Sequence, residues 1–268
     1  MRPGDNLSAA LVACQSDVPC SRLDSRDNLP GMMGWEPVPA GEKSRWGNFV
    51  RDPWLFLLVA LTAIALVPIW AFPYFPSQDG PSHLYNVFVL AHWNDTAFRF
   101  RDYYSLSLLP FPNWTATALL YALMQFLSPA TAHKALLTLY VVLMAVCWRW
   151  WIAVTRQAAA GHDLTDHAAT PLVLLGPLLS WSFFLMKGFY SFCFSLPFFL
   201  LAVGYAWKTR RETALAPTLL RNLLLIIVYL SHLVSFFLAL LSCLLIYLLA
   251  PWELRYTGGK AEIGRAHV

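Results

Sequence analysis

The segment 76–86, Pro-Ser-Gln-Asp-Gly-Pro-Ser-His-Leu-Tyr-Asn, holds an acid, an imidazole and two amides within a few positions. The carboxylate of Asp79 could accept a proton as a general base, or it could hold a divalent cation. The imidazole of His83 could move a proton near neutral pH. The same residue types are also common in plain turns, because Asp, Gly and Pro favour them. The segment is therefore a candidate site whose simplest alternative is a turn.

The composition places this segment in a membrane protein. The chain has 268 residues, of which 58% are hydrophobic and 13% charged, and its mean hydropathy is +0.51. Soluble domains carry about 25% charged residues. The 12 Trp, 18 Phe and 11 Tyr residues also favour a polytopic membrane protein. No basic stripe with interleaved aromatic residues is present, so the sequence predicts no nucleic-acid partner.

The first apolar run, Trp54–Phe75, contains about 20 uncharged residues and is long enough to cross a bilayer. Arg45 and Arg51 precede it, and basic residues favour the cytoplasmic side. The N-terminus is therefore expected in the cytoplasm, and the segment 76–86 is expected on the outer face.

The run 113–127 is short for a span and leaves two topologies open. The basic residues near the later runs are Arg149, Arg156, Lys208, Arg210 and Arg211. If 113–127 crosses the membrane, the last three of these lie outside. If it only lies on or dips into the outer leaflet, all five lie inside. The positive-inside rule favours the second topology.

This topology predicts an all-α polytopic membrane protein with about six transmembrane helices. The predicted spans are 54–75, 132–154, 171–186, 192–207, 217–229 and 233–249. The last two form a helical hairpin in this interpretation, although a single tilted helix is the alternative. Interfacial helices are expected in the outer loop 76–131.

The two ends of the chain are expected to lie outside the helical domain. Residues 1–48 are rich in Pro, Gly, Ser and Asp and predict a disordered cytoplasmic tail. Residues 49–256 form the predicted transmembrane domain. Glu262–Val268 matches the translation of a common sequencing adapter, so residues 257–268 are expected to be a non-native or truncated tail.

The predicted topology gathers several polar side chains at the outer face. They are Asp79, His83, Asp95, Asp102, Lys187, Tyr190 and His232. Ionisable groups at a membrane boundary are candidates for function. Each also has a structural explanation: a helix cap, a surface charge, a snorkelling amine or a buried hydrogen bond.

The layout of residues 54–155 resembles that of the GT-C membrane glycosyltransferases, which use polyprenyl-phosphate-linked sugars. A first helix leads into an outer loop with an early acidic residue, Asp79, and interfacial helices follow. The segment Pro112-Asn113-Trp114 is similar to the Pro-led juxtamembrane helix of those enzymes. Among them, the layout is most like that of the bacterial relatives of protein mannosyltransferases and aminoarabinose transferases. The chain departs from the family pattern in having Pro-Asn for the double proline and no Asp-x-Asp pair.

The resemblance implies an inverting sugar transfer from a lipid-phosphate donor at the outer face of a bacterial inner membrane. Together with the adapter-like end at Glu262–Val268, it leads us to expect that the chain is an N-terminal fragment of such an enzyme. Asp79 matches the family's key acid, and Asp102 or Asp95 could be the second acidic residue. In this interpretation Asp79, His83 and Asp102 are the catalytic candidates, and Asp79 and Asp102 could hold Mg²⁺ or Mn²⁺.

The remaining polar residues of the outer face are candidates for binding substrate. They are Lys187, Tyr190 and His232, and a cation among them would stabilise the leaving phosphate. Membrane lipid and the lipid-linked sugar are the expected partners.

Two other functions compete with this interpretation. A transporter or flippase of lipid-linked intermediates would need polar groups near the middle of the bilayer or broken helices in paired halves. A non-catalytic assembly protein would have no cavity that joins Asp79 to His232.

Overall fold

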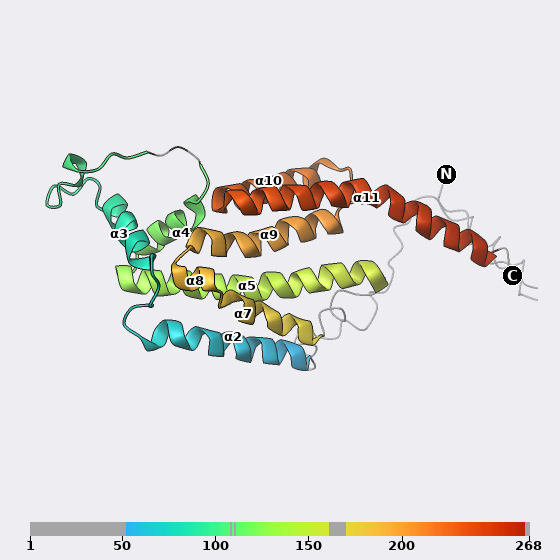
Figure 1. Cartoon of the computed structure of the whole chain (residues 1–268), viewed down its shortest axis with the longest axis horizontal. Helices are drawn as coiled ribbons and strands as arrows, with labels where there is room; N and C mark the ends of the chain where they lie inside the picture. Colours follow the sequence, from blue (N-terminus) through green and yellow to red (C-terminus); the bar gives the residue numbers. More distant parts are fainter. Residues whose placement is uncertain (1–51, 108, 110, 161–169, 266–268) are drawn as a thin grey trace, which may run out of the picture. The chain divides into compact units, whose positions relative to one another are not determined.

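The computed structural model describes residues 52–107, 109, 111–160 and 170–265. The expected tail at 1–48 lies outside these residues. The described residues form helices joined by loops, with no strand among them, which confirms the all-α class (Figure 1). The helices are α2 Pro53–Ala71, α3 Gly80–Ala91, η1 Phe100–Asp102, α4 Trp114–Met124, α5 Pro129–Ala160, η2 Pro171–Leu174, α7 Leu175–Ser180, α8 Phe183–Lys187, α9 Tyr190–Lys208, α10 Leu215–Ser231 and α11 Leu233–Arg265.

In the described part of the chain, four helical stretches are long and apolar enough to cross a membrane by length and composition. They are α2, Pro129–Gln157 of α5, α9, and Leu233–Ala250 of α11. The remaining two predicted spans correspond to shorter apolar elements. One is the 17-residue α10, and the other is Pro171–Lys187. The chain is thus a helical membrane protein with at least these candidate spans.

The prediction of one continuous helix over 171–186 is wrong. This stretch is divided into η2, α7 and α8, and the helix stops at Trp181. Ser182 then takes an extended conformation and caps α8, where its hydroxyl accepts from the N–H of Leu185. The sequence pattern of apolar residues did not reveal this interruption because both sides of the break are equally apolar.

The hairpin prediction for 217–249 is confirmed. The helix α10 ends at Ser231, and His232 has an extended backbone with φ −162° and ψ 130°. The helix α11 begins at the next residue and packs back on α10. It continues past the expected end at 249 as far as Arg265.

The short helix α4 has 11 residues. At 1.5 Å per residue it is about 16 Å long, roughly half of the hydrocarbon thickness of a bilayer. Its length therefore agrees with the topology in which 113–127 does not span.

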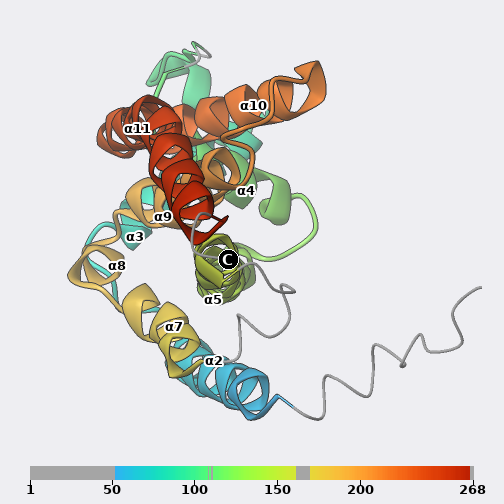
Figure 2. The same ribbon diagram turned by 90° about the vertical axis from the view of Figure 1, so that its right-hand side faces the viewer.

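The long helix α5 forms the centre of the bundle. The helices α2 and α7 pack on one side of it and α9 on the other, and α10 and α11 pack on α9 (Figures 1 and 2). Fully buried side chains of α5, such as Tyr140, meet Phe194 of α9 in the core. The helices α3 and α4 lie at the end of the bundle where α5 and α9 begin. This arrangement brings the segment 76–86 next to the start of α9.

Candidate functional site

A cavity of about 500 Å³ lies at this end of the bundle. Four turns or helix ends line it: the start of α3, the residue before α4, the junction of α8 with α9, and the α10–α11 turn. Its lining residues are Asp79, His83, Asn113, Phe184, Phe189, Tyr190, Ser191, Phe192, His232 and Val234. Four of the predicted outer-face residues, Asp79, His83, Tyr190 and His232, therefore share one cavity.

Two backbone hydrogen bonds fix the position of Asp79. The N–H of Gln78 donates to the carbonyl of Met186 at 3.0 Å, and the N–H of Asp79 donates to the carbonyl of Lys187, also at 3.0 Å. Gly188, which follows the two acceptor residues Met186 and Lys187, has φ +87°. Residues with a Cβ rarely adopt this backbone conformation. The main chain before α3 is thus held against the α8–α9 junction.

The side chain of Asp79 is not used to cap α3. Asp79 precedes the helix, and its carbonyl accepts the N–H of His83 at 3.1 Å, but its carboxylate makes no capping bond. A carboxylate in a simple turn usually bonds to the N–H groups that follow it. The Asp79 carboxylate is therefore available to the cavity that it lines.

Behind the cavity, one hydroxyl joins three elements. The phenolic oxygen of Tyr190 lies 2.6 Å from Oγ of Ser77 and 2.6 Å from Nε2 of His133 on α5. His133 and Tyr190 are both buried. A Cβ on Gly80 would collide with the Ser77 and Tyr190 hydroxyl oxygens, so this network has room only for a glycine after Asp79. The network fixes Tyr190 as part of the cavity wall.

The imidazole of His83 lies over the ring of Tyr190, with 5.5 Å between the ring centroids. Burial lowers the pKa of His83 below its ordinary value of 6.5, and the nearby charge of Asp79 opposes this only in part. At neutral pH the imidazole is therefore mostly neutral. A neutral imidazole beside a carboxylate can accept or relay a proton.

His232 occupies the turn between α10 and α11 and packs edge-on against Phe192. Its Nδ1 is buried and has no hydrogen-bond partner among the described residues. Burial also lowers the pKa of its imidazole. The hydroxyl of Ser231 donates to Oγ1 of Thr115 at 2.9 Å, which ties this turn to α4.

Three other predicted outer-face residues do not line the cavity. The ammonium of Lys187 donates to Oε1 of Gln78 at 2.5 Å. Asp102 forms an exposed ion pair with Arg99. Asp95 accepts the N–H of Ala97 within a turn and does not cap a helix.

The described residues fit a resident divalent metal poorly. No group of three or more His, Cys, Asp and Glu side chains among them is placed to hold a cation. Asp79 is the one carboxylate of the cavity lining, and Asp102 is engaged with Arg99. Asp79 and Asp102 therefore do not come together as a metal site in the described part of the chain.

Sequence reasoning missed His133 and Asn113. His133 lies in a mostly apolar run, and only the tertiary contact with Tyr190 connects it to the cavity. Asn113 has φ +76°, and its carbonyl accepts the hydroxyl of Ser191 at 2.9 Å. Asn tolerates this left-handed conformation better than most residues, which is the one signal that the sequence offered.

No protein-family model matches this chain, and no curated protein or solved structure does so either.

Proposed function

We propose that this chain is a glycosyltransferase-like integral membrane protein that transfers a sugar from a lipid-phosphate donor at the outer face of the membrane. The observation that carries the proposal is the cavity in which Asp79, His83, Tyr190 and His232 meet. A carboxylate, two imidazoles and a phenol in one cavity can supply the proton transfers and charge stabilisation of group transfer.

In the proposed reaction, Asp79 acts as the general base. An acceptor hydroxyl binds beside its carboxylate, and the hydroxyl oxygen attacks the anomeric carbon of the donor sugar. The new carbon–oxygen bond forms as the bond from the anomeric carbon to the phosphate oxygen breaks. Its electron pair stays on the lipid phosphate, and the hydroxyl proton passes to Asp79. A single displacement of this kind inverts the anomeric carbon.

The other lining residues have supporting roles in this proposal. His83 interacts electrostatically with Asp79 and could take up the transferred proton. His232 lines the cavity from the α10–α11 turn, where its imidazole could meet the leaving phosphate. The phenyl groups of Phe184, Phe189 and Phe192 give the cavity an apolar wall suited to the first part of a lipid chain.

The test uses the full chain in nanodiscs with radiolabelled undecaprenyl-phosphate sugars carrying glucose, mannose, N-acetylglucosamine or arabinose. Bacterial membrane lipid extract and water serve as acceptors. We expect label to leave one of these donors. Asp79→Asn should slow this transfer by about 10²–10⁴-fold, the range for loss of a general base. The elution profile and thermal unfolding of Asp79→Asn should match those of the wild type.

Asp102→Asn is the matched control, because it also removes one carboxylate of the outer loop but outside the cavity. It should transfer sugar at the wild-type rate. Full activity of Asp79→Asn would overturn the proposal, as would loss of activity in Asp102→Asn alone. If a donor binds and crosses a vesicle bilayer without any bond being broken, the protein is a flippase instead. If no donor is consumed or moved, the non-catalytic alternative holds.

A further inference from the structure

A second cavity of about 700 Å³ lies between α2 and α5. Its lining comes from α2 between Leu55 and Leu66 and from α5 between Val142 and Ala153. It does not share a residue with the cavity around Asp79. It lies toward the N-terminal end of α2, whereas the Asp79 cavity lies beyond the other end of that helix.

The dimensions of this groove match one leaflet of a bilayer. The α2 residues from Leu55 to Leu66 cover about 16 Å of helix at 1.5 Å per residue. Half of a hydrocarbon core of roughly 30 Å is about 15 Å. The groove thus runs from the start of a candidate span to about the middle of the membrane.

The groove is apolar along its length and carries a cation at the end that lies next to the start of α2. Its hydroxyl group, on Thr62, already donates to the carbonyl of Leu58 at 2.7 Å. The cation is Arg149, one of the lining residues. An apolar channel with a guanidinium at the interface complements an acyl chain with an anionic headgroup.

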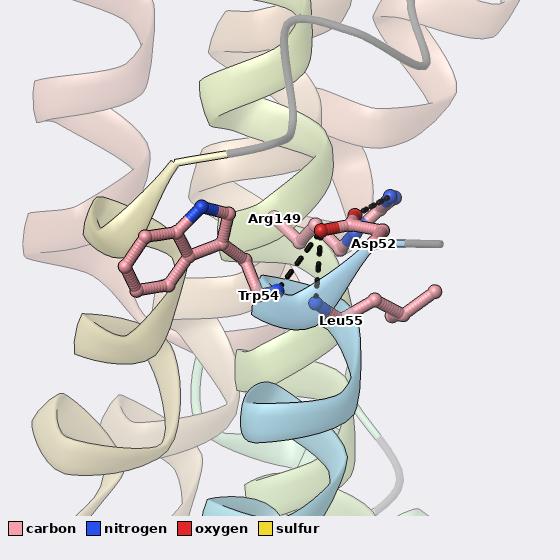
Figure 3. Close-up of polar contacts among 4 residues, drawn as sticks. All are labelled: Asp52, Trp54, Leu55 and Arg149. Atoms are coloured by element: carbon pink, nitrogen blue, oxygen red, sulfur yellow. Dashed lines mark hydrogen bonds and ion pairs between the residues drawn. The ribbon is translucent and has the colours of Figure 1, made fainter. Parts of the chain in front are cut away.

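The guanidinium of Arg149 has hydrogen-bonding capacity to spare. Its Nη2 lies 3.7 Å from Oδ2 of Asp52, longer than an ordinary hydrogen bond (Figure 3). Its Nε is buried and has no partner among the residues that the structure describes. The Arg149 side chain is nevertheless 30% exposed, so a phosphate oxygen could accept from the exposed part of its guanidinium.

Asp52 competes only weakly with a phosphate for Arg149, because its carboxylate already accepts backbone hydrogen bonds at the start of α2. Its Oδ1 accepts the N–H of Trp54 at 3.0 Å and that of Leu55 at 3.3 Å, as Figure 3 shows. The carboxylate therefore caps α2 and offsets the partial positive charge of the helix end. The guanidinium of Arg149 is therefore the positive charge of the groove that a lipid phosphate would contact.

We infer that the α2–α5 groove binds one anionic glycerophospholipid, with an acyl chain between the helices and its phosphate at Arg149. The lipid comes from the leaflet that adjoins the N-terminal end of α2. It fills the gap beside a helix that buries few of its own residues, of which Leu58 and Ile69 are the buried ones. The bound lipid thereby stabilises the attachment of α2 to the bundle.

The test is native mass spectrometry of the full chain with 1-palmitoyl-2-oleoyl phosphatidylglycerol and with phosphatidylcholine of the same chains. We expect one phosphatidylglycerol to be retained in preference to phosphatidylcholine. Arg149→Gln should weaken this binding about tenfold, the scale of one charge-assisted hydrogen bond. Arg156→Gln, an exposed arginine of the same helix, is the matched control and should bind as the wild type does.

A second pair of variants tests the acyl-chain part of the groove. Ala63 lines the groove and is exposed, so Ala63→Phe fills the groove without disturbing the core. Its neighbour Ile64 is exposed but outside the lining, so Ile64→Phe is the control. Only Ala63→Phe should lose the bound lipid.

Four outcomes would overturn the inference. The first is equal retention of the two lipids, and the second is equal weakening by Arg149→Gln and Arg156→Gln. The third is loss of lipid in Ile64→Phe as well. The fourth is displacement of phosphatidylglycerol by undecaprenyl phosphate at equal or lower concentration, which would assign the groove to a polyprenyl phosphate instead.

Discussion

The hydroxyl of Tyr190 lies 2.6 Å from Nε2 of His133, and both side chains are buried. This contact joins the first turn of α9 to the first turns of α5. The same hydroxyl is 2.6 Å from Oγ of Ser77, just before Asp79. A single phenol therefore connects the packed bundle to the loop that carries the candidate base.

Tyr190→Phe should destabilise the protein by removing this connection. The buried His133 Nε2 would lose its partner, which costs about 1–3 kcal/mol. The measurement is the free energy of unfolding in mixed micelles. Tyr205→Phe, further along the same helix, is the control and should cost less.

A double-mutant cycle tests the pairing itself. His133→Phe removes the group that Tyr190→Phe would leave unpaired. The two substitutions together should therefore cost less than the sum of the single ones, by more than about 0.5 kcal/mol. Strict additivity would show that the two side chains do not act as a pair.

Gly188→Ala should weaken the junction that holds Asp79. At φ +87° a Cβ is strained, and it would lie 2.8 Å from the backbone nitrogen of Gly80. We expect a loss of about 2–3 kcal/mol in unfolding free energy, together with a fall in transfer activity. Lys187→Ala is the control, because it keeps the backbone hydrogen bond to Asp79 and removes only a side chain that does not line the cavity. A stable and active Gly188→Ala variant would contradict this account of the junction.

The helical class and the hairpin at His232 could be predicted from the sequence because they follow from apolar run lengths and one polar interruption. Asp79, His83, Tyr190 and His232 were expected on one face, and they line one cavity. Their chemical roles stay predictions. The polar segment 76–86 was a usable signal because its surroundings are so apolar.

His133 and the break at Trp181 could not be predicted by the same means. A histidine within a helix of apolar residues has no local feature that distinguishes a core position from a cavity wall. Its role depends on Tyr190, which is far away in sequence. The break depends on the capping hydrogen bond of Ser182. The free energy of such a cap is about as large as the helix preference of the few residues around it, so the sequence alone does not show which one prevails.

The stability of the protein should fall as the pH drops below about 6.5. Burial lowers the pKa of His83 in the folded state, so the unfolded chain binds the proton more readily. Protonation therefore favours unfolding, and the loss continues until the pH reaches the lowered pKa of the folded protein. Chemical unfolding between pH of about 8 and 5 would measure it.

His83→Gln should reduce this pH dependence without removing it. The pKa of His232 is lowered as well and contributes in the same direction. If acidification stabilises the wild-type protein, or if His83→Gln leaves the slope unchanged, His83 does not carry a lowered pKa.

His232 should matter more than Lys187 for binding a lipid phosphate. His232 lines the cavity, whereas Lys187 does not line it and its ammonium is bonded to Gln78. Undecaprenyl-phosphate glucose is a suitable probe because its phosphodiester keeps one negative charge across the pH range used. His232→Asn should weaken its binding about tenfold, and Lys187→Gln should weaken it less.

The pH dependence of this binding distinguishes His232 from a residue that only shapes the cavity. The imidazole is mostly neutral in the free protein because burial lowers its pKa. A phosphate beside it favours the charged form, so binding takes up a proton and the affinity should rise as the pH falls from about 7 toward 5.5. Titrations of the probe in nanodiscs would show this rise in the wild type and in Lys187→Gln. The rise in affinity should be absent in His232→Asn. If the pH dependence persists in this variant, another group of the cavity, and not His232, contacts the phosphate.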